Sequence, residues 1–282
     1  MKNTLFLSLG VLLSAGTLLT ACSNDDGASD DSPAGSTWML TVKATKGGNE
    51  ATTRALSLGT DNKTLNATWA TTENVYVYYM ESGGNYTKHG VLHPTANSAE
   101  ATLTGNLTGF DDRFIEGQIS SGGFYITLQF PKEGQISYRG QNGTLENISS
   151  DYDWAIATVH IDGIDPDTKT IIPTSDVPEN FVNQQAIVKF TLKDNAGNSL
   201  NASSLKIGAT GLIDYGEYQG DVEINPERAT NVIWAALRGI NGTVTLTATT
   251  VDKVTYTYTT KEPKTFENGK YYDITVKMTQ KP

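Results

Sequence analysis

The chain has 282 residues and a formal net charge of −10, because 31 acidic side chains outnumber 21 basic ones. An acidic surface of this kind argues against nucleic acid, or an anionic membrane face, as the partner of the folded part. Asparagine, threonine, glycine and tyrosine are abundant, whereas long apolar stripes with a period of 3.6 residues are absent. The composition therefore predicts an all-β fold, and the length is sufficient for one large or two ordinary β domains.

The N-terminal segment has the form of a secretory signal. Lys2 precedes an apolar run, residues 5–19, that is shorter than the roughly 20 residues a membrane-spanning helix requires. The run ends at Ala21 and Cys22, and Cys22 is the only cysteine, so no disulfide can form within the monomer. This pattern resembles the lipobox of bacterial lipoproteins, which implies that residues 1–21 are a signal peptide and that Cys22 carries the lipid of an outer-membrane precursor. The alternative is an ordinary secreted protein whose cysteine falls there by chance.

Residues 22–35 are rich in Ser, Gly, Ala and Asp and contain no large apolar residue, so we expect an acidic flexible tether. Its first residues, Ser23 to Asp26, resemble the acidic surface-export signal of Gram-negative lipoproteins, which implies a location at the cell surface. A plain tether would have the same composition.

The first predicted strand covers residues 38–45, where apolar and polar residues alternate with a period of two. We expect Trp38, Leu40, Val42 and Ala44 to face the core. A polar run, residues 46–53, leads to Arg54. Shorter predicted strands follow at 55–58, 65–69, 75–80, 101–103, 124–130, 135–138 and 154–161, separated by glycine-containing turns. Short strands at this spacing predict a β-sandwich.

A change of composition between residues 162 and 183 predicts a domain boundary. Pro166, Pro173 and Pro178 lie in this interval, and proline is disfavoured in the interior of a sheet. We place the boundary near Ser175, which gives an N-terminal domain of residues 36–175 and a C-terminal domain of residues 176–282. The second set of predicted strands lies at 186–192, 205–209, 222–224, 232–237, 244–248, 254–258 and 272–278.

Taken in order, several segments resemble the fimbrillin family, the subunits of type V pili. They are LLTAC before the tether, ATTRALSL around Arg54, NATWATTENVYVYY at 66–79, VNQQAIVKFTL at 182–192 and FENGKYYDITVKM at 266–278. The resemblance implies two tandem transthyretin-like, Greek-key β-sandwich domains. It also implies that an arginine-specific surface protease cleaves between Arg54 and Ala55, which removes the first strand. Subunits then join other pilus subunits by donor-strand exchange in a homo- or hetero-polymer, the fimbrium, which supports adhesion to a host or bacterial surface ligand.

The physics of strand removal agrees with this interpretation, because a sandwich that loses a strand exposes two unpaired edges and an apolar trough. A candidate donor strand has inward residues at the same spacing: Tyr272, Ile274, Val276 and Met278. In one respect the chain departs from the family pattern. Shaft subunits are expected to carry an appendage after the last core strand, yet only residues 279–282 follow here. An anchor, a tip subunit or a non-polymerising surface lipoprotein therefore remains an alternative, and an exposed arginine in a polar loop need not be a cleavage site.

The sequence predicts no enzyme, cofactor or metal site. His89 and His93 are four residues apart, but in a predicted loop without the glutamate of a metalloprotease helix, and His160 lies in a predicted strand. Nucleophile-elbow, phosphate-loop and zinc-ligand spacings are missing. A carbohydrate-binding surface lipoprotein is the alternative from another functional class. Its predicted platform of aromatic side chains consists of Tyr76, Tyr78, Tyr256 and Tyr258.

Overall fold

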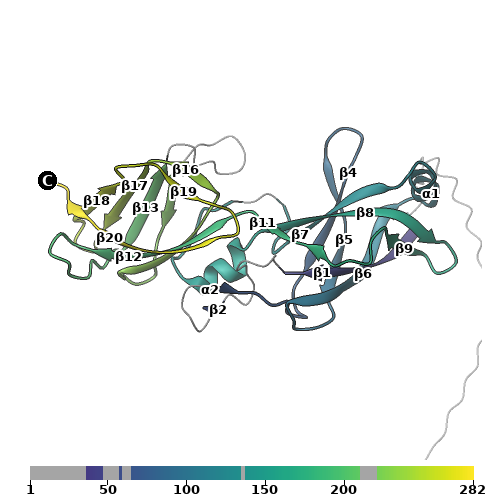
Figure 1. Ribbon diagram of the computed structural model, residues 1–282, viewed down its shortest axis with the longest axis horizontal. Coiled ribbons are helices and arrows are strands. Elements are labelled where there is room, and N and C mark those ends of the chain that lie inside the picture. The colour runs from purple at the N-terminus through teal and green to yellow at the C-terminus, as the bar shows by residue number, and fades with distance from the viewer. Residues whose placement is uncertain (1–35, 47–56, 59–64, 135–136, 210–220) are drawn as a thin grey trace, which may run out of the picture. The chain divides into compact units, whose positions relative to one another are not determined.

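The computed structural model describes residues 36–46, 57–58, 65–134, 137–209 and 221–282. Contacts group residues 34–282 into one compact unit, distinct from residues 1–33. Strands dominate the described part of the chain, as the composition predicted (Figure 1). No helix in those ranges is long and apolar enough to span a membrane.

The first half of the unit is built on one nine-stranded sheet. In chain order its elements are β1 (Ser36–Thr45), β4 (Val75–Met80), β5 (Tyr86–Pro94), β6 (Glu100–Phe110), β7 (Phe124–Phe130), β8 (Ala155–Asp165), β9 (Thr170–Pro173), β10 (Glu179–Asn180) and β11 (Val182–Asn183). The strand order is β10-β1-β6-β5-β4-β7-β8-β11, and β9 pairs with both β1 and β8. Because β9 links β1 to β8, the sheet closes on itself. This half therefore differs from the separate-layer sandwich that the spacing predicted.

A core of buried apolar side chains fills the closed sheet, with Trp38, Trp69, Phe130 and Phe181 among the largest. Helix α1 (Asp112–Ser120) adds Ile115 to this core. The two-residue strands β2 (Ser57–Leu58) and β3 (Leu65–Asn66) pair with each other. The short helices α2 (Leu145–Asn147) and η1 (Ile148–Tyr152) follow β7, and Ile148 and Tyr152 belong to the core of the second half.

The second half has two sheets around a second core, as expected for a sandwich. One sheet has the order β15-β12-β20 and the other β14-β13-β17-β18-β21. The bounds are β12 (Ala186–Lys193), β13 (Ser204–Ala209), β14 (Val222–Ile224), β15 (Val232–Leu237), β16 (Ile240–Gly242), β17 (Val244–Thr249), β18 (Thr255–Thr259), β19 (Lys264–Phe266), β20 (Tyr271–Lys277) and β21 (Thr279–Gln280). Strands β16 and β19 form a separate pair.

The interval 162–183, where the prolines predicted a domain boundary, contains strands of the first sheet. Strand β8 continues to Asp165, and β9, β10 and β11 all belong to the first sheet. The prolines do not interrupt these strands, because Pro166 and Pro178 lie outside them and Pro173 is the last residue of β9. The first sheet thus ends at Asn183 and the second sheet system begins at Ala186. Both residues follow the predicted domain boundary near Ser175.

Candidate functional site

Strand β1 carries the residues for which the sequence predicted a special role. Its inward side chains are buried, with at most 2% exposure, whereas Met39 and Lys43 on the other face are exposed. The buried set is Trp38, Leu40, Val42 and Ala44. Full burial of a large apolar side chain contributes about 1.5 to 3 kcal/mol. The inner row of β1 therefore contributes about 5 to 12 kcal/mol in total, an upper bound because the unfolded chain already buries part of this surface.

Hydrogen bonds hold β1 along both of its edges (Figure 1). On one side β1 runs antiparallel to β6 from Ser36 to Thr45. On the other side it runs parallel to β9 near Leu40 and to β10 near Thr45. The Met39 amide donates to the Lys169 carbonyl at 2.8 Å. If β1 left the sheet, β6 on one side and β9 with β10 on the other would face an empty position, which is the geometry that an added strand requires.

A cluster of polar contacts holds the N-terminal end of β1. Trp38 Nε1 donates to Asp112 Oδ1 at 3.2 Å, and Lys169 Nζ lies 2.7 Å from Asp112 Oδ2. The Lys169 ammonium also lies 4.7 Å from the centre of the Trp38 ring. Hydrogen bonds from Lys169 and from Ser36 lower the pKa of the Asp112 carboxyl, since they favour its charged form.

A buried ion pair holds the other end of β1, where the polar run of the sequence begins. The Lys46 side chain is 1% exposed, and its Nζ lies 2.6 Å from Glu73 Oε2. The same ammonium lies 4.7 Å from the centre of the Trp69 ring, and Trp69 Nε1 donates to the Ala44 carbonyl at 3.3 Å. The Glu73 carboxylate also accepts the Ala70 amide at 3.1 Å. Lys46 and Trp69 thus join the end of β1 to the loop that precedes β4.

The predicted processing and lipidation positions, Arg54, Ala55 and Cys22, lie outside the described residues. Lys46 is the last described residue before Arg54. Cleavage after Arg54 would therefore cut the chain shortly downstream of the end of β1.

The candidate donor residues Tyr272, Ile274, Val276 and Met278 lie in and directly after β20. Val276 and Met278 are buried in the second core, while Tyr272 and Ile274 are partly buried against it. Strand β20 pairs in parallel with β12 from Tyr271 to Lys277, and no second strand flanks it in the described part of the chain (Figure 1). Residues directly after it form β21, which pairs with β18 in the facing sheet.

The histidines do not form a catalytic or metal-binding arrangement in the described residues. His89 and His93 lie in β5, not in the predicted loop. The His89 ring stacks on Phe110 at 3.9 Å, and its Nδ1 lies 2.9 Å from the Thr108 carbonyl oxygen. Within the described ranges, no group of three or more His, Cys, Asp or Glu side chains is placed to hold a metal ion.

The predicted tyrosine platform does not form a single surface. Tyr76 and Tyr78 lie on β4 of the first sheet, and Tyr78 is buried. Tyr256 and Tyr258 lie on β18 of the second sheet system. High β propensity is sufficient to explain tyrosine at these positions.

No protein-family model matches this sequence, and no curated protein sequence matches it. The chain is similar to the solved structure of a candidate cell adhesion protein from Bacteroides ovatus ATCC 8483, with 13% identity and a TM-score of 0.48, covering 87% of this chain and 96% of that one. A candidate cell adhesion protein from Bacteroides uniformis ATCC 8492 has 13% identity, a TM-score of 0.41 and coverages of 86% and 96%. The shaft pilin SpaA from Lactobacillus rhamnosus GG has 12% identity, a TM-score of 0.34 and coverages of 88% and 99%.

Proposed function

We propose that this chain is a surface-exported lipoprotein that becomes a pilus subunit when cleavage after Arg54 releases β1. Cys22 carries the lipid of the precursor, and β1 occupies its own sheet until cleavage. A strand from a neighbouring subunit then takes the place of β1. The alternative is a surface lipoprotein that keeps β1 and does not polymerise, such as an anchor or a tip.

The setting of β1 is the observation that supports this proposal. The strand is paired along both edges, its inner row is buried, and it is the described segment immediately upstream of Arg54. A strand with these properties inhibits assembly while it is present and leaves a template for strand addition when it departs. The incoming strand has to supply an inner row similar to Trp38, Leu40 and Val42.

The first experiment compares three versions of the full-length precursor on cells. Arg54→Ala should accumulate as lipidated monomer, whereas the wild type should start at Ala55 and form ladders that resist SDS. Arg54→Lys is the matched control, because it keeps the positive charge but removes the arginine. It should resist an arginine-specific protease and still yield ladders after trypsin treatment. Normal polymerisation of Arg54→Ala would refute the processing step.

The second experiment locks β1 in place. The hydroxyls of Thr41 on β1 and Thr104 on β6 lie 3.1 Å apart on the exposed face, in paired register. A Thr41→Cys and Thr104→Cys double variant should form a cross-strand disulfide. We expect the oxidised variant to be cleaved at Arg54 without polymerising, and reduction of the disulfide to restore ladders. Polymers formed by the oxidised protein would show that β1 does not have to leave.

To identify the donor strand, a second disulfide has to hold β20 in its own subunit. Val276→Asp is a poor test, because Val276 lies in the core of its own subunit and a buried charge would unfold it. Thr191 on β12 and Thr275 on β20 are paired in register on the face opposite Val276. A Thr191→Cys and Thr275→Cys disulfide should block polymers only if Tyr272, Ile274, Val276 and Met278 are the donor residues. Ladders in the oxidised state would assign the donor role to another segment.

A further inference from the structure

A cavity of about 670 Å³ opens on the outer face of the first sheet, away from β1. This volume lies within the range of about 300 to 1,000 Å³ found for ligand pockets. Its floor comes from the centre of the sheet, where Tyr78, Thr127 and Thr158 are neighbours in register across β4, β7 and β8. The tip of the β4–β5 hairpin contributes Asn85 and Tyr86.

Backbone contacts fix the walls of this cavity. Gln129 donates from its side-chain amide to the carbonyls of Lys132 and Gly134, at 3.1 and 2.8 Å. The Gly134 amide in turn donates to the Tyr78 hydroxyl at 3.0 Å. On the opposite side the Tyr138 hydroxyl donates to the Gln184 carbonyl at 2.7 Å. The cavity is therefore formed before any ligand arrives.

Several polar groups that line the cavity remain available to a ligand. The hydroxyls of Thr127 and Thr158 and the side-chain amide of Asn85 make no hydrogen bond with another described residue. The side-chain amide of Gln129 donates its hydrogens to backbone carbonyls, so its side-chain carbonyl oxygen remains as an acceptor. Hydroxyls and amides that both donate and accept suit a ligand rich in hydroxyl groups.

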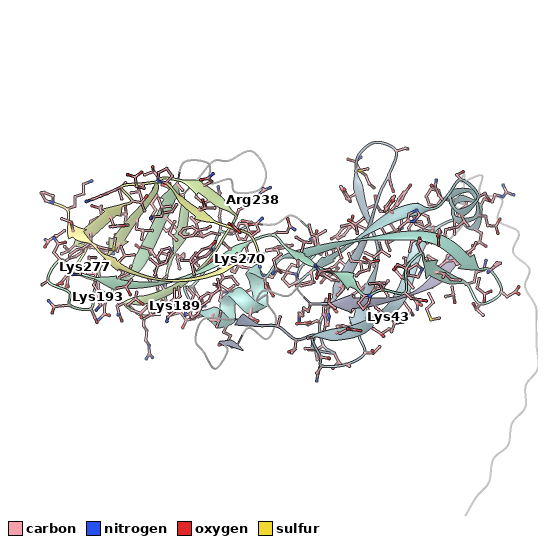
Figure 2. The ribbon with its side chains drawn as sticks, in the orientation of Figure 1. Lys43, Lys189, Lys193, Arg238, Lys270 and Lys277 are labelled. Carbon is pink, nitrogen blue, oxygen red and sulfur yellow. The ribbon has the colours of Figure 1, made fainter. Side chains whose placement is uncertain are left out.

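The aromatic and charged residues of the lining further restrict the chemical class of ligand that the cavity can bind. The Tyr86 side chain is 60% exposed, so its ring offers a flat apolar face beside these polar groups. Arg238, which directly follows β15, is the one charged residue among the described residues of the lining (Figure 2). The lining includes no carboxylate in the described residues, although the chain carries a net charge of −10. Arg238 already has an interaction within the protein. A guanidinium has five N–H donors, however, so it can in addition bind a carboxylate of a ligand through paired hydrogen bonds.

The position on the sheet argues against a peptide bound by strand addition. Strand β7 at the centre of the floor is already paired with β4 on one side and β8 on the other. No main-chain edge is therefore open to a peptide at this point. Recognition has to proceed through side chains.

We propose that this cavity binds an acidic oligosaccharide, with Tyr86 against a sugar ring, Thr127 and Thr158 on its hydroxyls, and Arg238 on its carboxylate. No lining residue belongs to β1, so binding does not depend on whether β1 is released. A subunit that polymerises and one that remains a monomer would both retain the site.

Titration calorimetry on the full-length protein tests the proposal with four defined probes. Trigalacturonic acid and 3′-sialyllactose are acidic sugars, maltotriose is a neutral one, and tricarballylate carries carboxylates without sugar rings. We expect at least one acidic sugar to bind with a Kd below about 10 mM and more tightly than maltotriose or tricarballylate. Saturation-transfer NMR should show contact between that sugar and a tyrosine ring.

Substitutions then assign the contacts. Tyr86→Ala should weaken binding about tenfold. Its matched control is Tyr125→Ala, which removes a tyrosine of similar exposure, 63%, that does not line the cavity. Thr127→Val should weaken binding about threefold. Thr191→Val, on β12, should leave binding unchanged. Arg238→Gln should weaken acidic sugars about tenfold, and near-UV circular dichroism should show that the variant remains folded.

Three results would overturn the proposal. The first is that neither acidic sugar binds below about 10 mM. The second is equal binding of maltotriose with no effect of Arg238→Gln, which would refute the acidic class. The third is an equal loss in Tyr86→Ala and Tyr125→Ala, which would place the sugar elsewhere.

Discussion

Strands β1 and β20 have similar alternating sequences, yet the structure holds them in different ways. Strand β1 is paired along both edges, and a polar cluster secures each of its ends. Among the described strands, β20 has a neighbour along one edge only, and part of its inner row is incompletely buried. An alternating pattern therefore predicts a strand but does not predict how firmly that strand is held.

The difference bears directly on strand exchange. In the proposed mechanism a strand held as firmly as β1 stays in place while the chain is intact, and cleavage after Arg54 triggers its release. A strand held along one edge costs less to move, although Val276 and Met278 would lose the burial they have in the second core. Substitutions that alter one strand at a time can measure this asymmetry.

The largest expected effect concerns the buried ion pair at the end of β1. Glu73→Gln removes the carboxylate that pairs with Lys46, so the buried ammonium loses this counter-charge. We expect the free energy of unfolding, measured with urea, to fall by about 3 to 5 kcal/mol. The matched control is Glu133→Gln, since the Lys88–Glu133 pair is exposed at 37% and 53% and should contribute about 0 to 1 kcal/mol. Equal losses in the two variants would mean that Lys46 does not secure β1.

The next effect compares the inner rows of the two strands. Leu40 on β1 is fully buried, so Leu40→Ala should lower the free energy of unfolding by about 2 to 5 kcal/mol. Ile274 at the middle of β20 is partly buried, and Ile274→Ala should cost about 1 to 2 kcal/mol, since less apolar area is lost. Urea unfolding followed by tryptophan fluorescence measures both. A larger cost at Ile274 would reverse the comparison.

A smaller effect is expected at the other end of β1, where Asp112 accepts from Trp38 and pairs with Lys169. Because these contacts lower the pKa of Asp112, they stabilise the fold above the ordinary aspartate pKa of about 4 and lose their effect as the pH falls through the lowered value. Asp112→Asn should therefore reduce stability slightly at pH 7 and flatten its decline at acidic pH. Thermal unfolding between pH 2 and 7 would show this, and identical pH profiles for wild type and variant would contradict it.

The sequence predicted strands well where alternation is regular and short-range. Strands β4, β7, β14 and β15 begin and end at the predicted residues. The pattern failed at β5, where Gly90 and two histidines gave the appearance of a loop. Gly90 is required by packing, since a Cβ at this position would clash with the Asn106 carbonyl oxygen on β6. Helix α1 was missed as well, because Gly117 interrupts a short segment that depends on the Asp111 cap.

The contacts that secure β1 could not be predicted, because they join residues far apart in the sequence. Lys46 and Glu73 are separated by 27 positions, and Asp112 and Lys169 by 57. The sequence indicated that residues 46–53 are polar, but burial of Lys46 depends on Trp69 and Glu73 meeting it in three dimensions. The inner row from Trp38 to Ala44 was predictable, since a period of two determines which side chains share a face.

The smallest effect concerns the titration of Tyr271, which reports where β20 lies. Burial, with the nearby Asp273 carboxylate, raises the pKa of the Tyr271 hydroxyl to about 12. A raised pKa stabilises the folded protein below the ordinary tyrosine value of about 10, and this contribution disappears as the pH rises through about 12. Burial also raises the pKa of Tyr78 and Tyr152, so ultraviolet difference titration of the monomer should show several late-titrating phenols, of which Tyr271→Phe removes one. If β20 leaves its core during assembly, Tyr271 in the polymer should titrate near 10 instead. An unchanged late titration in polymers would show that β20 stays beside β12 and that another segment is the donor.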